Sequence, residues 1–200
     1  GGYLAAGKLH IVAGAPGTGK TTLAMSIAAI ISTGRHWPDG TLARLGKIVI
    51  WSGEDDPNDT LVPRLSAMGA DLSQIFFVEG ASEIINGNRC RVAFDPSKHL
   101  DALARHIAHD PPALLIIDPI VSAVAGDSHK NAETRRALQP LVDIARQHGV
   151  AVLGITHFSK GTQGRDPTER VTGSLAFGAV ARVVMVCSKT QENTRVFMRS

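Results

Sequence analysis

The chain carries the stretch Gly14-Ala15-Pro16-Gly17-Thr18-Gly19-Lys20-Thr21, which fills every fixed position of the pattern G-x-x-x-x-G-K-[ST]. An apolar run at 9–13 precedes it and predicts a strand, and a second apolar run at 23–31 follows it and predicts a helix. Glycines let the backbone curl so that its N–H groups converge on phosphate oxygens. The start of the helix adds the positive end of its dipole. The stretch therefore predicts a phosphate-binding loop rather than a glycine-rich turn without a ligand.

The ligand that this loop predicts is ATP together with Mg²⁺. We expect Lys20 to reach the β- and γ-phosphates and Thr21 to supply a hydroxyl to the metal ion. The expected nucleotide contacts are Gly14, Ala15, Pro16, Gly17, Thr18, Gly19, Lys20, Thr21 and Thr22.

The composition fits one α/β domain. Hydrophobic residues make up 44% of the 200 residues and aromatic residues only 4%, so the apolar content consists mainly of aliphatic side chains, as in a buried parallel sheet. A net charge of +3 is too small to indicate nucleic-acid binding by itself. Cys90 and Cys187 are far apart and predict neither a disulfide framework nor a zinc site. We expect a cytoplasmic protein without a membrane partner, and we expect the sequence to be an excerpt from a longer chain.

Strand-like and helix-like runs alternate along the sequence. We expect strands at 9–13, 47–52, 75–78, 113–117, 151–156, 183–187 and 195–198, and helices at 20–32, 59–68, 97–108 and 131–148. Pro140 predicts a kink in the last helix or a second helix that begins near Gln139. The longest irregular stretches are expected at 80–91, 120–130 and 159–172. This alternation predicts a mainly parallel, twisted sheet with helices on both faces.

Three of the expected strands end in residues that suit phosphate chemistry. The apolar run 114–117 ends at Asp118, a position from which a carboxylate orders a water molecule on Mg²⁺. Glu54 follows the run 48–52 and is the best candidate for the base that activates water. The alternative is that Glu54, Asp55 and Asp56 cap the next helix.

The third such strand, at 151–156, ends at His157. We weigh a γ-phosphate sensor at this position against a solvated or capping histidine, which is the more common role of a lone histidine. The other seven histidines have no comparable context, and we expect them on the surface.

The combination of the loop, Ser52-Gly53-Glu54-Asp55, Ile117-Asp118 and Thr156-His157-Phe158-Ser159-Lys160 resembles the RecA-type ATPase core of plasmid RepA hexameric helicases and related phage helicase or primase-helicase proteins. Trp37-Pro38-Asp39-Gly40 is similar to this group as well. The resemblance implies a RecA-like fold, Glu54 as catalytic glutamate and His157 as γ-phosphate sensor.

The resemblance also implies a hexameric ring of this chain, with ATP between subunits and single-stranded DNA in the central channel. The loop after His157 would carry Lys160, Arg165 and Arg170 to the DNA, although a solvated loop explains these charges nearly as well. A finger that reaches the neighbour's nucleotide is expected near the last strand, where Arg195 and Arg199 are the candidates. These expectations favour a DNA helicase, and a RecA- or clock-type ATPase that controls assembly without unwinding is the alternative.

Overall fold

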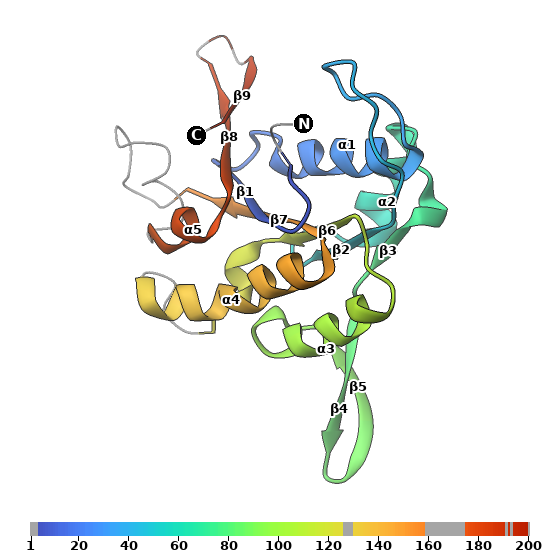
Figure 1. The fold of residues 1–200 in the computed structure, drawn as a ribbon, viewed down its shortest axis with the longest axis vertical. Coiled ribbons are helices and arrows are strands. Elements are labelled where there is room, and N and C mark those ends of the chain that lie inside the picture. The colour runs from blue at the N-terminus through green and yellow to red at the C-terminus, as the bar shows by residue number, and fades with distance from the viewer. Residues whose placement is uncertain (1–3, 126–129, 159–174, 191, 193, 200) are drawn as a thin grey trace.

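In the part of the chain that the structure describes, seven strands form one twisted sheet that passes through the centre of the molecule (Figure 1). The computed structural model describes residues 4–125, 130–158, 175–190, 192 and 194–199. Along the sheet the order is β3-β2-β6-β7-β1-β8-β9. These strands are β1 (Leu9–Gly14), β2 (Ile48–Ser52), β3 (Ile75–Phe77), β6 (Leu114–Asp118), β7 (Ala151–His157), β8 (Val183–Lys189) and β9 (Arg195–Arg199). All neighbours pair in parallel except β8 and β9, which are antiparallel.

Helices cover both faces of this sheet, which confirms the predicted α/β class (Figure 1). α1 (Lys20–Thr33) and α2 (Val62–Ala67) pack on one face, and α3 (Pro96–His109), α4 (Asn131–His148) and α5 (Leu175–Val180) pack on the other. Short helical turns lie at η1 (Pro57–Leu61), η2 (Leu72–Gln74) and η3 (Ile120–Ala123). Among the described residues, no helix is both long and apolar enough to cross a lipid bilayer.

The core consists of two apolar layers because successive side chains of a strand point to opposite faces. On β6, Leu115 and Ile117 pack towards α3 and α4, whereas Leu114 and Ile116 pack towards α1. All four are fully buried. Strands that are buried on both faces read as continuous aliphatic runs, which explains why the apolar runs located most strands to within two residues.

The segment 80–91, which we expected to be irregular, is instead a β-hairpin. β4 (Gly80–Ile85) pairs in antiparallel register with β5 (Asn88–Ala93). The turn residues Asn86 and Gly87 have φ values of 51° and 80°, the positive values that a type I′ hairpin turn requires. The hairpin projects from the end of β3, away from the central sheet (Figure 1).

α4 runs without interruption from Asn131 to His148, so the prediction of a second helix near Gln139 is wrong. Pro140 lies between Leu138 and Leu141, which are both fully buried. Packing of an apolar face supplies most of a helix's stability in a protein, and here it outweighs the backbone hydrogen bond that proline cannot donate.

Two histidines that we expected on the surface are buried. His10 on β1 has its Nδ1 atom 3.2 Å from the carbonyl oxygen of Val152, and its Nε2 atom accepts a hydrogen bond from the Ala5 amide. Burial lowers the pKa of His10. His99 on α3 lies 2.6 Å from a carboxylate oxygen of Glu83 and accepts the Asp95 amide at its other nitrogen. It therefore links α3 to the hairpin strand β4.

Candidate functional site

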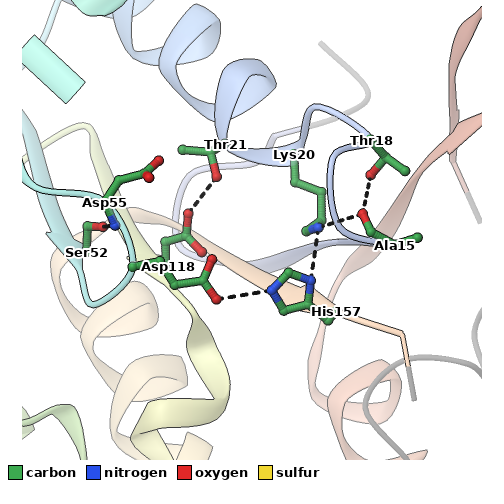
Figure 2. Close-up of polar contacts among 9 residues, drawn as sticks. Ala15, Thr18, Lys20, Thr21, Ser52, Asp55, Asp118 and His157 are labelled. Atoms are coloured by element: carbon green, nitrogen blue, oxygen red, sulfur yellow. Dashed lines mark hydrogen bonds and ion pairs between the residues drawn. The ribbon is translucent and has the colours of Figure 1, made fainter. Parts of the chain in front are cut away.

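The predicted phosphate-binding loop connects β1 to α1. Gly17 and Gly19 adopt φ values of 73° and 95°, which glycine reaches without steric cost. The Thr18 hydroxyl donates to the Ala15 carbonyl at 2.8 Å and closes the loop on itself (Figure 2). Ala15, Pro16 and Gly17 form an exposed rim. The first amides of a helix have no partner within that helix, so the start of α1 supplies the donors that an anion needs.

Gly14 permits close contact between the loop and β8. A β-carbon at this position would lie 2.3 Å from the Cys187 carbonyl oxygen and 2.9 Å from the Thr18 hydroxyl oxygen. The first fixed glycine of the motif is thus required by packing between adjacent strands, in addition to the loop's curvature.

Thr21 and Asp118 lie together at the carboxyl end of the sheet, as the sequence predicted. The Thr21 hydroxyl donates to Asp118 Oδ2 at 2.9 Å (Figure 2). Asp118 is only 3% exposed, and its burial raises the pKa of its carboxyl to about 6, against the opposing hydrogen bond from Thr21. The nearby Glu54 charge raises this pKa further, and Lys20 lowers it. Burial makes ionisation of this carboxyl unfavourable, so a cation bound beside it would stabilise the charged form.

A carboxylate and a hydroxyl are the hard oxygen ligands that Mg²⁺ prefers. Among the described residues, no cluster of three or more His, Cys, Asp or Glu side chains forms a metal cage. At a phosphate site, Mg²⁺ is held by one or two protein groups, water and the substrate phosphates. Thr21 and Asp118 are the residues that would hold it.

Lys20, His157 and Glu54 form a continuous polar chain across the site. The Lys20 ammonium lies 3.0 Å from the Ala15 carbonyl and 3.2 Å from His157 Nδ1 (Figure 2). Since an ammonium only donates, Nδ1 is the acceptor and the ring proton is on Nε2. That nitrogen lies 3.1 Å from Glu54 Oε1 and donates to it. The three residues come from α1, β7 and the end of β2, so the fold brings together every predicted catalytic side chain.

Lys20 is 6% exposed, and its burial is the main reason that its pKa is lowered. The carboxylates of Asp118 and Glu54 act in the opposite direction and raise it. A cation with little solvent exposure interacts more strongly with an added anion than a solvated cation does. This is the electrostatic condition for binding and polarising a phosphate group.

The three acidic residues after β2 have different partners. Glu54 faces His157, Asp55 pairs with Arg64 at 3.1 Å, and Asp56 accepts the amides of Asn58 and Asp59 and so caps η1. The capping role that we considered for all three therefore belongs to Asp56. The Gly53 amide donates to the Asp118 carbonyl at 2.7 Å, which holds the end of β2 and thus Glu54 next to β6.

The structure describes only some of the remaining candidate residues. Arg195, at the start of β9, lies beside the phosphate-binding loop of its own chain. Arg199 ends β9, and its side chain is outside the description. Lys160, Arg165 and Arg170 lie outside the described residues. Cys187 was not expected near the site, but the Lys20 charge acts on its buried thiol, whose pKa burial raises. No sequence motif distinguishes this cysteine.

Residues 1–163 match a family model described as an AAA domain. The chain belongs to the AAA domain family. Within this family its fold is RecA-like. The RadB recombinase has 21% sequence identity and a TM-score of 0.62, over 98% of this chain and 81% of that chain. A KaiC-like protein of the hyperthermophilic archaeon Pyrococcus horikoshii has 20% identity and a TM-score of 0.64, over 97% of this chain and 78% of that chain. No curated protein matches the sequence significantly. The chain is therefore a RecA-like ATPase domain, and the finer resemblance to RepA helicases stays a prediction.

Proposed function

We propose that this domain hydrolyses ATP with Mg²⁺ and acts as a DNA helicase motor in plasmid, phage or prophage replication. The observation that carries the catalytic part is the hydrogen-bonded chain Lys20–His157–Glu54 next to the Thr21–Asp118 pair. This arrangement gathers a buried ammonium, a carboxylate beside an imidazole and a hydroxyl–carboxylate pair at one end of the sheet, which supports roles in phosphate binding, base catalysis and metal binding. The resemblance to RepA-type helicases supports the motor role.

Each residue has a defined task in this proposal. Glu54 accepts the proton of the attacking water, and Lys20 neutralises charge on the phosphoryl group that is transferred. When bound, Mg²⁺ neutralises further phosphate charge. His157 contacts both Lys20 and Glu54. A movement of either residue would therefore alter a hydrogen bond of the imidazole at the end of β7. This is the position from which a sensor reports hydrolysis to the following loop.

The helicase role further requires a ring of subunits and single-stranded DNA as partner. The resemblance to RepA-type helicases implies six subunits in the ring. Lys160, Arg165 and Arg170 are the proposed DNA contacts, and Arg199 is a proposed finger towards a neighbour's nucleotide. The second candidate function is a RecA- or clock-type ATPase whose nucleotide state controls assembly. The named relatives of similar fold, a recombinase and a KaiC-like protein, favour this alternative.

One set of assays separates these functions. ATP turnover is measured with and without single-stranded DNA, together with strand separation on a forked duplex, for the wild type and Lys20→Ala. Turnover that DNA stimulates, strand separation, and loss of both in the variant are the results expected of a helicase. Turnover without strand separation supports the assembly ATPase. Normal turnover by Lys20→Ala contradicts the assignment of the site.

A further inference from the structure

Arg195 reaches the phosphate-binding loop because the β8–β9 hairpin extends past the end of β1. Gly14, the last residue of β1, is in register with Cys187 of β8. β8 continues for two residues beyond this point, to Lys189, whose partner on β9 is Arg195. Since β8 runs parallel to β1, the pair Lys189–Arg195 lies beyond the carboxyl end of β1, where the loop begins.

The side chain of Arg195 rests against this loop. A β-carbon added to Gly19 would lie 3.4 Å from Arg195 Cδ, 3.6 Å from its Nε and 4.0 Å from its Cζ. These are ordinary van der Waals distances, so the Arg195 side chain packs directly on the loop at Gly19. The φ of 95° at Gly19 is what favours glycine at this position. The guanidinium is thus adjacent to the start of α1 in the same chain.

Within the described part of the chain, no carboxylate forms an ion pair with Arg195. A guanidinium placed against an anion-binding loop, with no acidic partner there, is available for a phosphate. Its planar fork of N–H donors matches phosphate oxygens better than an ammonium does.

Arg195 and the catalytic chain approach the loop from opposite sides. His157 is on β7 and Glu54 follows β2, whereas Arg195 is on β9, and the sheet order places β1 between these two groups. In the proposed function, Lys20, Glu54 and His157 act at the γ-phosphate end of the nucleotide. A nucleotide bound in that direction would have the nucleoside end of its phosphate chain on the β9 side of β1.

We propose that Arg195 binds in cis the nucleoside end of the phosphate chain held by its own loop. This inference rests on the proposed function, because it requires a nucleotide at this loop. It gives Arg195 a role at its own site in place of the predicted role at a neighbour's site. The contact involves phosphates that ADP and ATP share, so Arg195 contributes equally to the affinity for both.

Binding of fluorescently labelled ADP and ATP tests this proposal in the wild type, Arg195→Ala and Arg195→Lys. We expect Arg195→Ala to lower the affinity for both nucleotides about tenfold. This is at the lower end of the effects expected for a hydrogen bond to a charged group, because the arginine is exposed. Arg195→Lys keeps the charge without the fork and should show a smaller loss. The matched control is Arg91→Ala on the hairpin strand β5, where the side chain is 79% exposed and which belongs to a separate two-stranded sheet. The nucleotide affinities of this variant should equal those of the wild type.

A mixing experiment distinguishes cis from trans action. Arg195→Ala chains keep Lys20, and Lys20→Ala chains keep Arg195, so a site that needs both residues in one chain stays incomplete in any mixture. We expect no gain in labelled-nucleotide affinity on mixing. A gain, unchanged affinities of Arg195→Ala, or a loss for ATP without a loss for ADP would overturn the cis role alone. A wild type that binds neither nucleotide would overturn the proposed function and this inference with it.

Discussion

Asp118→Asn should stabilise the chain in the absence of nucleotide and divalent cation. The pKa of the buried carboxyl is raised from 3.8 to about 6 on folding, so the folded state binds more protons than the unfolded state between these values. Stability therefore falls as pH rises through this range. With 1.36 kcal/mol per pKa unit, the ionised group costs about 3 kcal/mol at pH 7. Asparagine removes this cost and still offers an oxygen to the Thr21 hydroxyl.

Urea unfolding in EDTA at several pH values measures this effect. The gain in unfolding free energy from Asp118→Asn should be about 3 kcal/mol at pH 7 and should decline to about 0.5 kcal/mol at pH 4, where the unfolded carboxyl also becomes protonated. The control is Asp101→Asn on the exposed face of α3, for which no such pH-dependent gain is expected.

The same substitution should weaken nucleotide binding that depends on Mg²⁺, because an amide is a poorer ligand for a hard cation than a carboxylate. The residue is thus expected to trade stability for function. A variant that is no more stable than the wild type at pH 7, or equally stabilised at pH 4 and pH 7, would refute the reasoning about desolvation of this carboxyl.

Three further predictions follow from the site and its packing. Glu54→Gln should retain nucleotide binding and lose about a hundredfold in turnover, the scale of a missing general base, whereas Asp55→Asn should turn over ATP at nearly the wild-type rate; equal rates for both would place the base elsewhere. Gly14→Ala should lower the melting temperature, since its β-carbon would lie 2.3 Å from a backbone oxygen, whereas Gly178→Ala in α5, where a β-carbon meets nothing within 4 Å, should not. Neutralising Lys160, Arg165 and Arg170 together should flatten the salt dependence of single-strand binding by about 0.7 in log–log slope per lost phosphate contact, and an unchanged slope in a salt titration would assign them to a solvated loop.

The parts of the fold that the sequence could predict are those with one dominant physical signal. β1, the loop and α1 were predictable because the glycine pattern and the flanking apolar runs agree with one another. The ends of β2, β6 and β7 were predictable because a polar residue follows each buried aliphatic run. Parallel strands align their carboxyl ends, so Glu54, Asp118 and His157 had to share one edge of the sheet.

The hydrogen-bond pattern within the site was not predictable in the same way. Nothing in the spacing indicates that His157 lies between Lys20 and Glu54, because this depends on strand order, and the order β2-β6-β7-β1 is set by packing between distant segments. The burial of His10 and His99 likewise depends on partners that only tertiary structure supplies. The β4–β5 hairpin was different, because its Asn86–Gly87 pair is the strongest short-range signal for a hairpin and the sequence interpretation overlooked it.

The hairpin also makes this domain easy to modify. Among the described residues, its strands pair only with each other, and it is attached to the domain by the contact of Glu83 in β4 with His99 and by Phe94, which follows β5 and lies in the core. Residues inserted between Asn86 and Gly87 would lengthen the tip without breaking any pairing of the central sheet. Natural insertions at this point would therefore leave the nucleotide site intact, and we expect relatives to differ in the length of this hairpin. For the same reason, a fluorophore or affinity tag placed at the tip would report on the domain while leaving its nucleotide site unaltered.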